Sequence, residues 1–328
     1  MISRGHLSRK APSGPSPFAP REAAPLPRHK FVDPRVTADG SPRAQVALQR
    51  LDTLWFNTGT LCNLSCANCY IESSPTNDAL VYLTAAEVSD FLDQLHTPIE
   101  IGFTGGEPFM NPDFLAMLRD VLGRGHRALV LTNAMKPMQR HAQGLLALLA
   151  EHGDRLTLRV SVDHYTSAVH EAERGPGSWA PMLAGLQWLS ASGFALDVAG
   201  RHLGHESDGA ARAGYAALFA EHAIAVPALD PARLVLFPEM DAQADIAEIT
   251  QACWGILGKE PSSVMCASSR MVVRRKGEER ARVAACTLLP FDPQFDLGAD
   301  LEEASRDVAL NHPHCARFCV LGGASCSA

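Results

Sequence analysis

Three cysteines stand within eight residues of the sequence, at Cys62, Cys66 and Cys69. Thiolates are soft ligands that select zinc, Cu(I) or iron–sulfur clusters. A closed structural zinc site needs a fourth ligand nearby, and the next cysteine along the chain is Cys253. Three thiolates on a four-iron cluster leave one iron without a protein ligand, where chemistry can take place. The spacing therefore indicates a metal centre with a free coordination position, and a zinc site or a redox-inert group of thiols remains the alternative.

The elements that must position these thiols follow a regular pattern. After residue 50, short apolar and β-branched runs alternate with helical patterns. The expected strands span residues 51–59, 99–105, 127–134, 155–163, 194–201 and 233–240, and the expected helices span 83–96, 111–125, 138–153, 178–193 and 208–223. Repeated strand–helix units give a parallel sheet with right-handed crossovers. The pattern thus predicts an α/β fold with a barrel-like sheet, complete or partial, over residues 51–250. We expect a partial (β/α)6 TIM-like barrel.

Chemically distinctive residues gather where the predicted strands end. The three cysteines follow the first strand, and Gly105, Gly106 and Glu107 follow the second. Paired glycines let a backbone approach a ligand closely, and a carboxylate pairs with a cation. Ligands of parallel α/β sheets bind at the carboxyl ends of the strands. The later strands place further polar side chains at the same edge, namely Asn133, Ser161, Asp163 and Arg201.

On these residues the sequence resembles the radical S-adenosylmethionine (radical SAM) enzymes. The family signature is the CxxxCxxC spacing followed by an aromatic residue, here Tyr70, and residues 103–108 match its Gly-Gly-Glu-Pro element. The resemblance extends over residues 51–328. It implies a 4Fe–4S cluster on the three cysteines, with S-adenosylmethionine bound to the free iron through its amino and carboxylate groups. One electron would then split the sulfonium and yield a 5′-deoxyadenosyl radical.

The resemblance also implies roles for the residues that follow the second and fourth strands. Gly105, Gly106 and Glu107 would hold the ammonium group of the cofactor. Ser161 and Asp163 would bond the hydroxyl groups of its ribose. A tight turn before a helix is the plain structural alternative for the glycines.

Three more residues complete the implied cofactor site. Arg201 would face the carboxylate of the methionine moiety, with a surface or helix-dipole cation as the alternative. Asn133 would be a polar neighbour of the cofactor, or simply a turn residue. Tyr70 would pack on the adenine, or would be a core aromatic residue.

A second set of cysteines lies in the last 78 residues, which hold six of the nine cysteines and few helical signals. This predicts a small, loop-rich module over residues 251–328 that a metal stabilises. Two β-like runs flank Lys276 and Gly277, and such a hairpin would bring Cys266 and Cys286 together. The arrangement resembles the twitch/SPASM extension of radical SAM enzymes, although its spacing is longer. We expect one auxiliary 4Fe–4S cluster, or structural zinc, on Cys266, Cys286 and two of Cys315, Cys319 and Cys326.

Charge divides the chain into a basic beginning and an acidic body. Residues 1–50 carry nine Lys and Arg, three Asp and Glu, and eight of the 22 prolines. We expect a disordered tail there, with a transit peptide as the alternative. The other 278 residues carry a net charge of −13, which argues against nucleic acid as the main partner.

The sequence offers no sign of a membrane or secreted protein. No run of eighteen apolar residues predicts a membrane helix, and no apolar region predicts secretion. We therefore expect a cytoplasmic chain whose cysteines bind metal rather than form disulfides. Cys253 is expected to pack as a small hydrophobic residue.

We interpret the chain as a radical SAM enzyme, of oxidoreductase or transferase type, that abstracts hydrogen from a substrate. Its electron donor would be of flavodoxin or ferredoxin type. Family members with such modules modify peptides or build cofactors, and the lack of a recognisable peptide-binding domain before the barrel favours a small-molecule substrate. One alternative is a transferase that moves a group of the cofactor. Another is a non-catalytic iron–sulfur or zinc protein for electron transfer.

Overall fold

One sheet of nine strands forms the centre of the computed structural model, which describes residues 14–19, 24–239 and 241–323. Its order is β10-β9-β8-β2-β3-β4-β5-β6-β7, and the seven strands from β8 to β7 run parallel to one another. The strands of this sheet are β2 (Thr53–Asn57), β3 (Glu100–Thr104), β4 (Arg127–Thr132), β5 (Leu156–Ser161), β6 (Ala195–Arg201), β7 (Leu234–Phe237), β8 (Ser269–Val273), β9 (Arg282–Ala284) and β10 (Asp296–Gly298). A separate pair joins β1 (Gln45–Val46) to β11 (Val308–Ala309).

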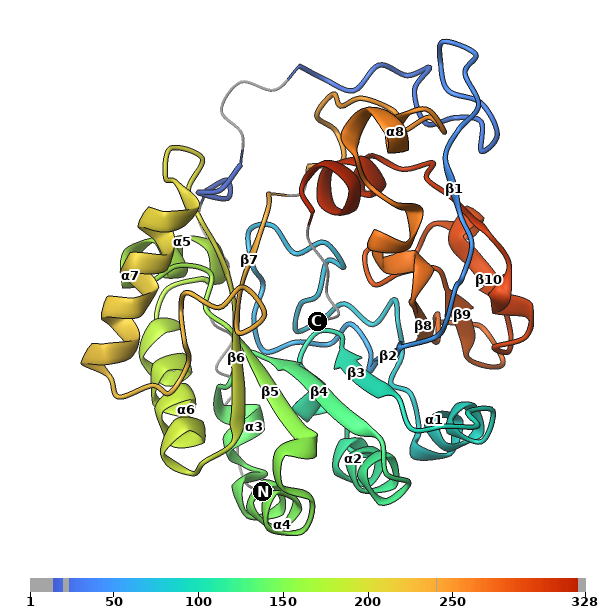
Figure 1. Cartoon of the computed structure of the whole chain (residues 1–328). Helices are drawn as coiled ribbons and strands as arrows, with labels where there is room; N and C mark the ends of the chain where they lie inside the picture. Colours follow the sequence, from blue (N-terminus) through green and yellow to red (C-terminus); the bar gives the residue numbers. More distant parts are fainter. Residues whose placement is uncertain (1–13, 20–23, 240, 324–328) are drawn as a thin grey trace.

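Helices line the convex side of the curved sheet (Figure 1). They are α1 (Ala85–Leu92), α2 (Phe114–Gly123), α3 (Lys136–Gln139), α4 (Ala142–His152), α5 (Ser167–Arg174), α6 (Trp179–Ala191) and α7 (Asp208–Glu221), and a short α8 (Cys253–Leu257) follows later in the chain. The six expected strands and five expected helices are confirmed as β2–β7 and as α1, α2, α4, α6 and α7. The α/β fold class with parallel strands is also confirmed. None of the described helices has both the length and the apolar character needed to cross a bilayer.

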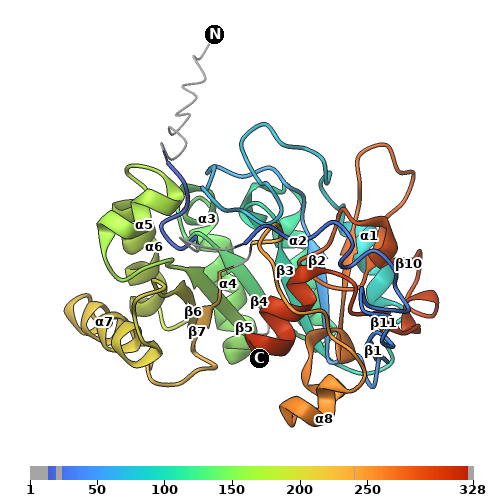
Figure 2. The same cartoon turned by 90° about the horizontal axis from the view of Figure 1, so that it is seen from above.

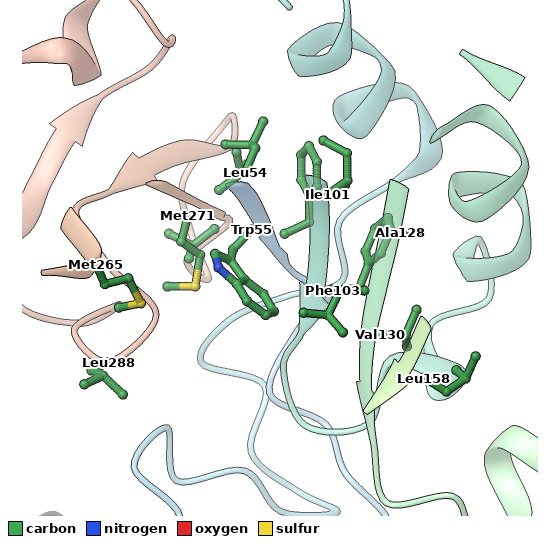
Figure 3. Close-up of a cluster of buried hydrophobic side chains, with 14 of the residues drawn as sticks. Leu54, Trp55, Ile101, Phe103, Ala128, Val130, Leu158, Met265, Met271 and Leu288 are labelled. Atoms are coloured by element: carbon green, nitrogen blue, oxygen red, sulfur yellow. The ribbon is translucent and has the colours of Figure 1, made fainter. Parts of the chain in front are cut away.

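The core explains why the strands read as continuous apolar runs. All five residues of β2 are buried, because helices cover one face of the sheet and the interior of the barrel covers the other. Trp55 fits between its neighbours because Gly102, opposite it on β3, has no side chain. A Cβ at Gly102 would lie 2.4 Å from the Trp55 ring. On its other side Trp55 pairs with Met271 of β8 (Figure 3).

The C-terminal cysteine-rich region continues the sheet of the barrel. Strand β8 pairs in parallel with β2, and β9 returns antiparallel to β8. This confirms the hairpin expected around Lys276 and Gly277, where Gly277 takes a positive φ of 89°. The hairpin places Cys266 before β8 and Cys286 after β9, so both sulfurs lie at one end of it.

The structure differs from the sequence-based expectation for residues 24–50, which are packed rather than disordered. Arg43 is fully buried and pairs with Glu248 at 2.5 Å. Its guanidinium also donates to the carbonyl of Asp33 at 2.7 Å, and β1 pairs with β11. Glu248 and β11 lie more than 200 residues along the chain from Arg43 and β1, and the segment itself has no periodic apolar pattern. Composition alone therefore suggested disorder. The remaining part of the expected tail, residues 1–13 and 20–23, lies outside the described residues.

Asp296 of β10 binds two arginines of the hairpin and supports a prediction about acid stability. Its carboxylate lies 2.7 Å from Arg275 and 2.6 Å from Arg282. Burial would raise the pKa of Asp296, but the hydrogen bonds from both arginines outweigh it and lower that pKa to about 2. Because the folded pKa lies below the unfolded one, the stabilisation is present above about pH 4 and is lost as the pH falls towards 2.

We expect Asp296→Asn to lower the free energy of unfolding at pH 7 by about 1–2 kcal/mol. The variant and the parent should become equally stable near pH 2. Urea unfolding of the metal-free protein at several pH values measures both effects. The control is Asp52→Asn, which removes an exposed pair with Arg50 and should change stability by less than about 0.5 kcal/mol. Equal stability of Asp296→Asn and the parent at pH 7 would contradict the prediction.

Candidate functional site

The loop between β2 and α1 brings its three cysteines to one cavity at the carboxyl ends of the strands. We call this the first cavity. Cys62 is buried, and Cys66 and Cys69 are partly buried. The amide of Leu64 donates to the Cys62 sulfur at 3.4 Å, and that of Ser73 donates to the Cys69 sulfur at 3.3 Å. Backbone donors of this kind favour sulfur that carries negative charge.

Burial keeps the thiols of Cys62 and Cys66 protonated in the absence of a metal. It raises the pKa of Cys62 well above its ordinary range and the pKa of Cys66 to about 12. A metal supplies the positive charge that lets such thiols ionise, because thiolates rather than thiols are its ligands. The donor set therefore fits a metal cluster better than a free, reactive cysteine.

The turn after β3 lies directly against the cysteine loop. The amide of Gly106 donates to the carbonyl of Gly59 at 2.8 Å, and the amide of Glu107 donates to the carbonyl of Leu61 at 3.2 Å. A Cβ at Gly106 would lie only 2.2 Å from the Leu61 carbonyl oxygen, and Gly105 has a φ of 135°. Both glycines are thus required by the close approach of the two backbones.

Glu107 is fully buried behind the first cavity and does not line it. Its carboxylate accepts hydrogen bonds from the Thr132 hydroxyl at 2.8 Å and from the Asn133 amide at 2.9 Å. Burial raises the pKa of Glu107 to about 7. In the structure this carboxylate fixes the end of β4, and its expected contact with an ammonium group stays a prediction.

Two arginines and three carboxylates form a buried ionic network at the ends of β5 and β6. Asp163 lies 2.5 Å from Arg174 and 3.6 Å from Arg201. Arg201 also lies 3.8 Å from Glu173 and 3.2 Å from Glu239. Burial would raise the pKa of Asp163, but the two arginines outweigh it and lower that pKa to about 2. Asp163 is therefore ionised, and it orients both guanidinium groups.

The same network holds the cysteine loop from the other side. The Glu173 carboxylate accepts from the Asn68 amide at 3.0 Å, and the Glu173 carbonyl accepts from the amide of Ala67 at 2.7 Å. The Asn68 side chain also donates to Glu239. Asn68 lies between Cys66 and Cys69, so these bonds fix the position of both thiols.

The first cavity gathers all the residues that the sequence predicted for the barrel site except Glu107. Those that line it are Cys62, Cys66, Cys69, Tyr70, Gly105, Gly106, Asn133, Ser161, Asp163 and Arg201. Sequence reasoning missed Asn68, Glu173 and Arg174, which also line it. Glu173 and Arg174 stand in residues 170–179, a run with several charged residues that comes soon after the fourth strand. Its position near the carboxyl end of that strand could have identified them.

A second cavity lies in the C-terminal region, and four cysteines line it: Cys266, Cys286, Cys315 and Cys319. Its other walls are mostly apolar. Burial raises the pKa of Cys266 to about 11 and that of Cys315 well above its ordinary range. Four thiols in an apolar cavity match the donor set of a fully ligated iron–sulfur cluster or of zinc. Cys326, the remaining candidate, lies outside the described residues.

Two further observations concern Cys253 and the placement of possible metal ligands. Cys253 lines neither cavity, and its sulfur accepts from the amide of Thr250 at 3.3 Å. In the part of the chain that the structure describes, no three His, Cys, Asp or Glu side chains converge on a point where they could hold a single metal ion, so the thiols of either cavity would have to draw together around a zinc ion.

Comparison with known protein families supports the interpretation of the first cavity. Residues 56–208 match the Radical SAM superfamily. Over 141 residues the chain is 33% identical to the antilisterial bacteriocin subtilosin biosynthesis protein AlbA of Bacillus subtilis, covering 42% of this chain and 30% of AlbA. Over 136 residues it is 29% identical to the mycofactocin maturase MftC of Mycobacterium ulcerans, covering 41% of this chain and 35% of MftC. The chain thus spans about a third of the length of these curated relatives.

Solved structures show the same fold at low sequence identity. SuiB of Streptococcus suis, bound to S-adenosylmethionine, has a TM-score of 0.54 and 12% identity, over 76% of this chain and 64% of SuiB. The complex of SuiB with the precursor peptide SuiA gives the same TM-score, with 14% identity over 77% of this chain and 63% of SuiB.

Proposed function

We propose that this chain, whose residues 56–208 match the Radical SAM superfamily, cleaves S-adenosylmethionine reductively and uses the 5′-deoxyadenosyl radical to abstract hydrogen from a substrate. The observation that carries the proposal is the single cavity that joins Cys62, Cys66 and Cys69 to the Gly105–Gly106 turn and to Arg201. The three thiolates would hold a 4Fe–4S cluster with one iron free of protein ligands. When bound, the cluster supplies the electron that cleaves the sulfonium.

The side chains of the first cavity bind and orient the cofactor in this proposal. The guanidinium of Arg201 pairs with the methionine carboxylate, and Asp163 fixes its direction. Gly105 and Gly106 let the cofactor ammonium approach the backbone. Ser161 bonds the ribose, and Tyr70 packs on the adenine. The ionic bonds of Asp163 to Arg174 and Arg201 support an orienting role for Asp163 in addition to the ribose contact that the resemblance implies.

We infer that the substrate is a peptide. The relatives support this, since AlbA is named for the biosynthesis of a bacteriocin and SuiB was solved with a precursor peptide. Sequence reasoning favoured a small molecule, because it treated residues 1–50 as disordered and found no peptide-binding domain. The packed residues 24–50 weaken that argument, because this part of the chain has structure of its own.

The second cavity is proposed to hold an auxiliary 4Fe–4S cluster on Cys266, Cys286, Cys315 and Cys319. Four thiolates would leave no iron free, so such a cluster would transfer electrons or stabilise the module rather than bind S-adenosylmethionine. Structural zinc is the competing proposal for the same donors. The electron for the first cavity would come from an external protein of flavodoxin or ferredoxin type.

Product analysis after anaerobic reconstitution with iron and sulfide tests the proposed function. With dithionite as reductant, the protein should release free 5′-deoxyadenosine from S-adenosylmethionine and should bind about eight irons per chain. Adenosyl or aminocarboxypropyl groups transferred to another molecule would instead indicate the transferase alternative. Zinc at both sites without cleavage would leave a non-catalytic metal protein and would refute the proposal.

A further inference from the structure

Phe18 is buried against Arg201, one of the residues that line the first cavity. Its side chain is only 4% exposed. The ring centroid lies 5.3 Å from the guanidinium carbon of Arg201 and 6.4 Å from the ring centroid of His164. Arg201 ends β6 and His164 follows β5, so Phe18 lies where two neighbouring strands end. It is not part of the main hydrophobic core, and its burial against a cation needs another explanation than core packing.

The ring of Phe18 completes the surroundings of the Arg201 guanidinium. Three carboxylates already lie within 4 Å of that group, those of Asp163, Glu173 and Glu239. The face of an aromatic ring is electron-rich, so it attracts a cation and also keeps water away from it. A guanidinium held between carboxylates and a ring has little freedom to rotate. A ligand carboxylate then meets a preorganised group, which lowers the entropic cost of binding.

The rest of the N-terminal segment, residues 24–50, is attached to the C-terminal half of the chain near the barrel mouth. The amide of Leu26 donates to the carbonyl of Gln243 at 2.6 Å, and the amide of Asp245 donates to the carbonyl of Ala24 at 2.7 Å. Lys30 pairs with Asp245 at 2.7 Å. Figures 1 and 2 show the described N-terminal residues crossing from the side of β1 to the side of α5 and β7. Residues 14–19 therefore belong to an N-terminal segment whose later residues, 24–50, are fixed to the rest of the chain by these hydrogen bonds and this ion pair.

We propose that Phe18 is a positioning residue of the cofactor site, whose ring holds the Arg201 guanidinium in the direction that binds the cofactor carboxylate. The inference rests on the proposed function only in taking S-adenosylmethionine as the ligand of Arg201. The ring itself touches no reacting atom and acts through Arg201. Its effect therefore falls on binding rather than on the rate of the chemical step.

The test compares Phe18→Ala, Phe18→Leu and Phe18→Tyr in the full-length, reconstituted protein. Loss of the ring should raise the KM for S-adenosylmethionine about five- to thirty-fold, the range that a desolvated cation–π contact gives, and should change kcat by less than about twofold. Phe18→Leu should resemble Phe18→Ala, because leucine fills space without a π face. Phe18→Tyr should restore the parental KM. Phe291→Ala, which removes a partly exposed phenylalanine elsewhere, is the matched control and should leave KM unchanged.

A second measurement does not depend on catalysis. Hydrogen–deuterium exchange of peptides from residues 195–206 should be faster in Phe18→Ala and Phe18→Leu than in the parent and in Phe18→Tyr. Unchanged exchange, an unchanged KM in Phe18→Ala, or full rescue by Phe18→Leu would overturn the inference, because the ring would then only fill space. If the parent cleaves no S-adenosylmethionine, the proposed function fails, and the exchange pattern alone still decides whether Phe18 positions Arg201.

Discussion

Replacing Cys62, Cys66 and Cys69 together with alanine is expected to abolish the cleavage of S-adenosylmethionine. The three thiols line the first cavity, and without them no cluster can deliver an electron to the cofactor. The fold should persist, because the loop is also held by the bonds of Glu173 to Ala67 and Asn68. Chromatographic assay for 5′-deoxyadenosine under dithionite measures the loss, and circular dichroism checks the fold.

Iron analysis of the same triple variant separates the two cavities. If the second cavity holds its own 4Fe–4S cluster, the variant should keep about four irons per chain after reconstitution. The control is Cys253→Ala, because this thiol lines neither cavity, and it should retain full cleavage. Cleavage by the triple variant, or its loss in Cys253→Ala, would show that the active cluster has been assigned to the wrong thiols.

Gly106→Ala is expected to remove nearly all cofactor cleavage through a purely steric effect. The new methyl group would lie 2.2 Å from the backbone carbonyl oxygen of Leu61, next to Cys62. Backbone on both sides must then separate, which costs about 1–3 kcal/mol of folding free energy and moves the cysteine loop. Iron content, cleavage rate and urea unfolding measure the three consequences.

Gly123→Ala is the matched control for that substitution. Gly123 ends α2, and apart from its own stretch of helix nothing lies within 4 Å of the place where its Cβ would be. The change should leave iron binding and cleavage as in the parent and should stabilise the helix slightly. Full cleavage by Gly106→Ala would mean that the turn and the cysteine loop are not packed as tightly as described.

Local sequence patterns sufficed to predict the barrel and most of its cavity. A buried parallel strand is a short apolar run and a covering helix has a period near 3.6 residues, so β2 to β7 and their helices could be read directly. Since parallel strands end at one edge, residues as distant as Cys62 and Arg201 could be expected to meet. Each of these inferences needs only neighbours along the chain and one rule about sheets.

Such local patterns could not predict contacts between segments that are far apart in the sequence. Arg43 and Glu248 form a buried pair, but each is a single charge in a segment without periodicity. Glu173 is fully buried although it stands in a short, charged helix that resembles a solvated one. Phe18 belongs to a proline-rich stretch, and only the folded chain shows that its ring lies against Arg201.

The pairing of β8 with β2 couples the C-terminal region to the barrel. Hydrogen bonds run without interruption from the hairpin into the barrel, so melting of the hairpin would expose the edge of β2. Metal captured by the second cavity would consequently protect the barrel against heat as well. A chain shortened after residue 250 would lose that partner strand, and the bared edge of β2 would be prone to self-association.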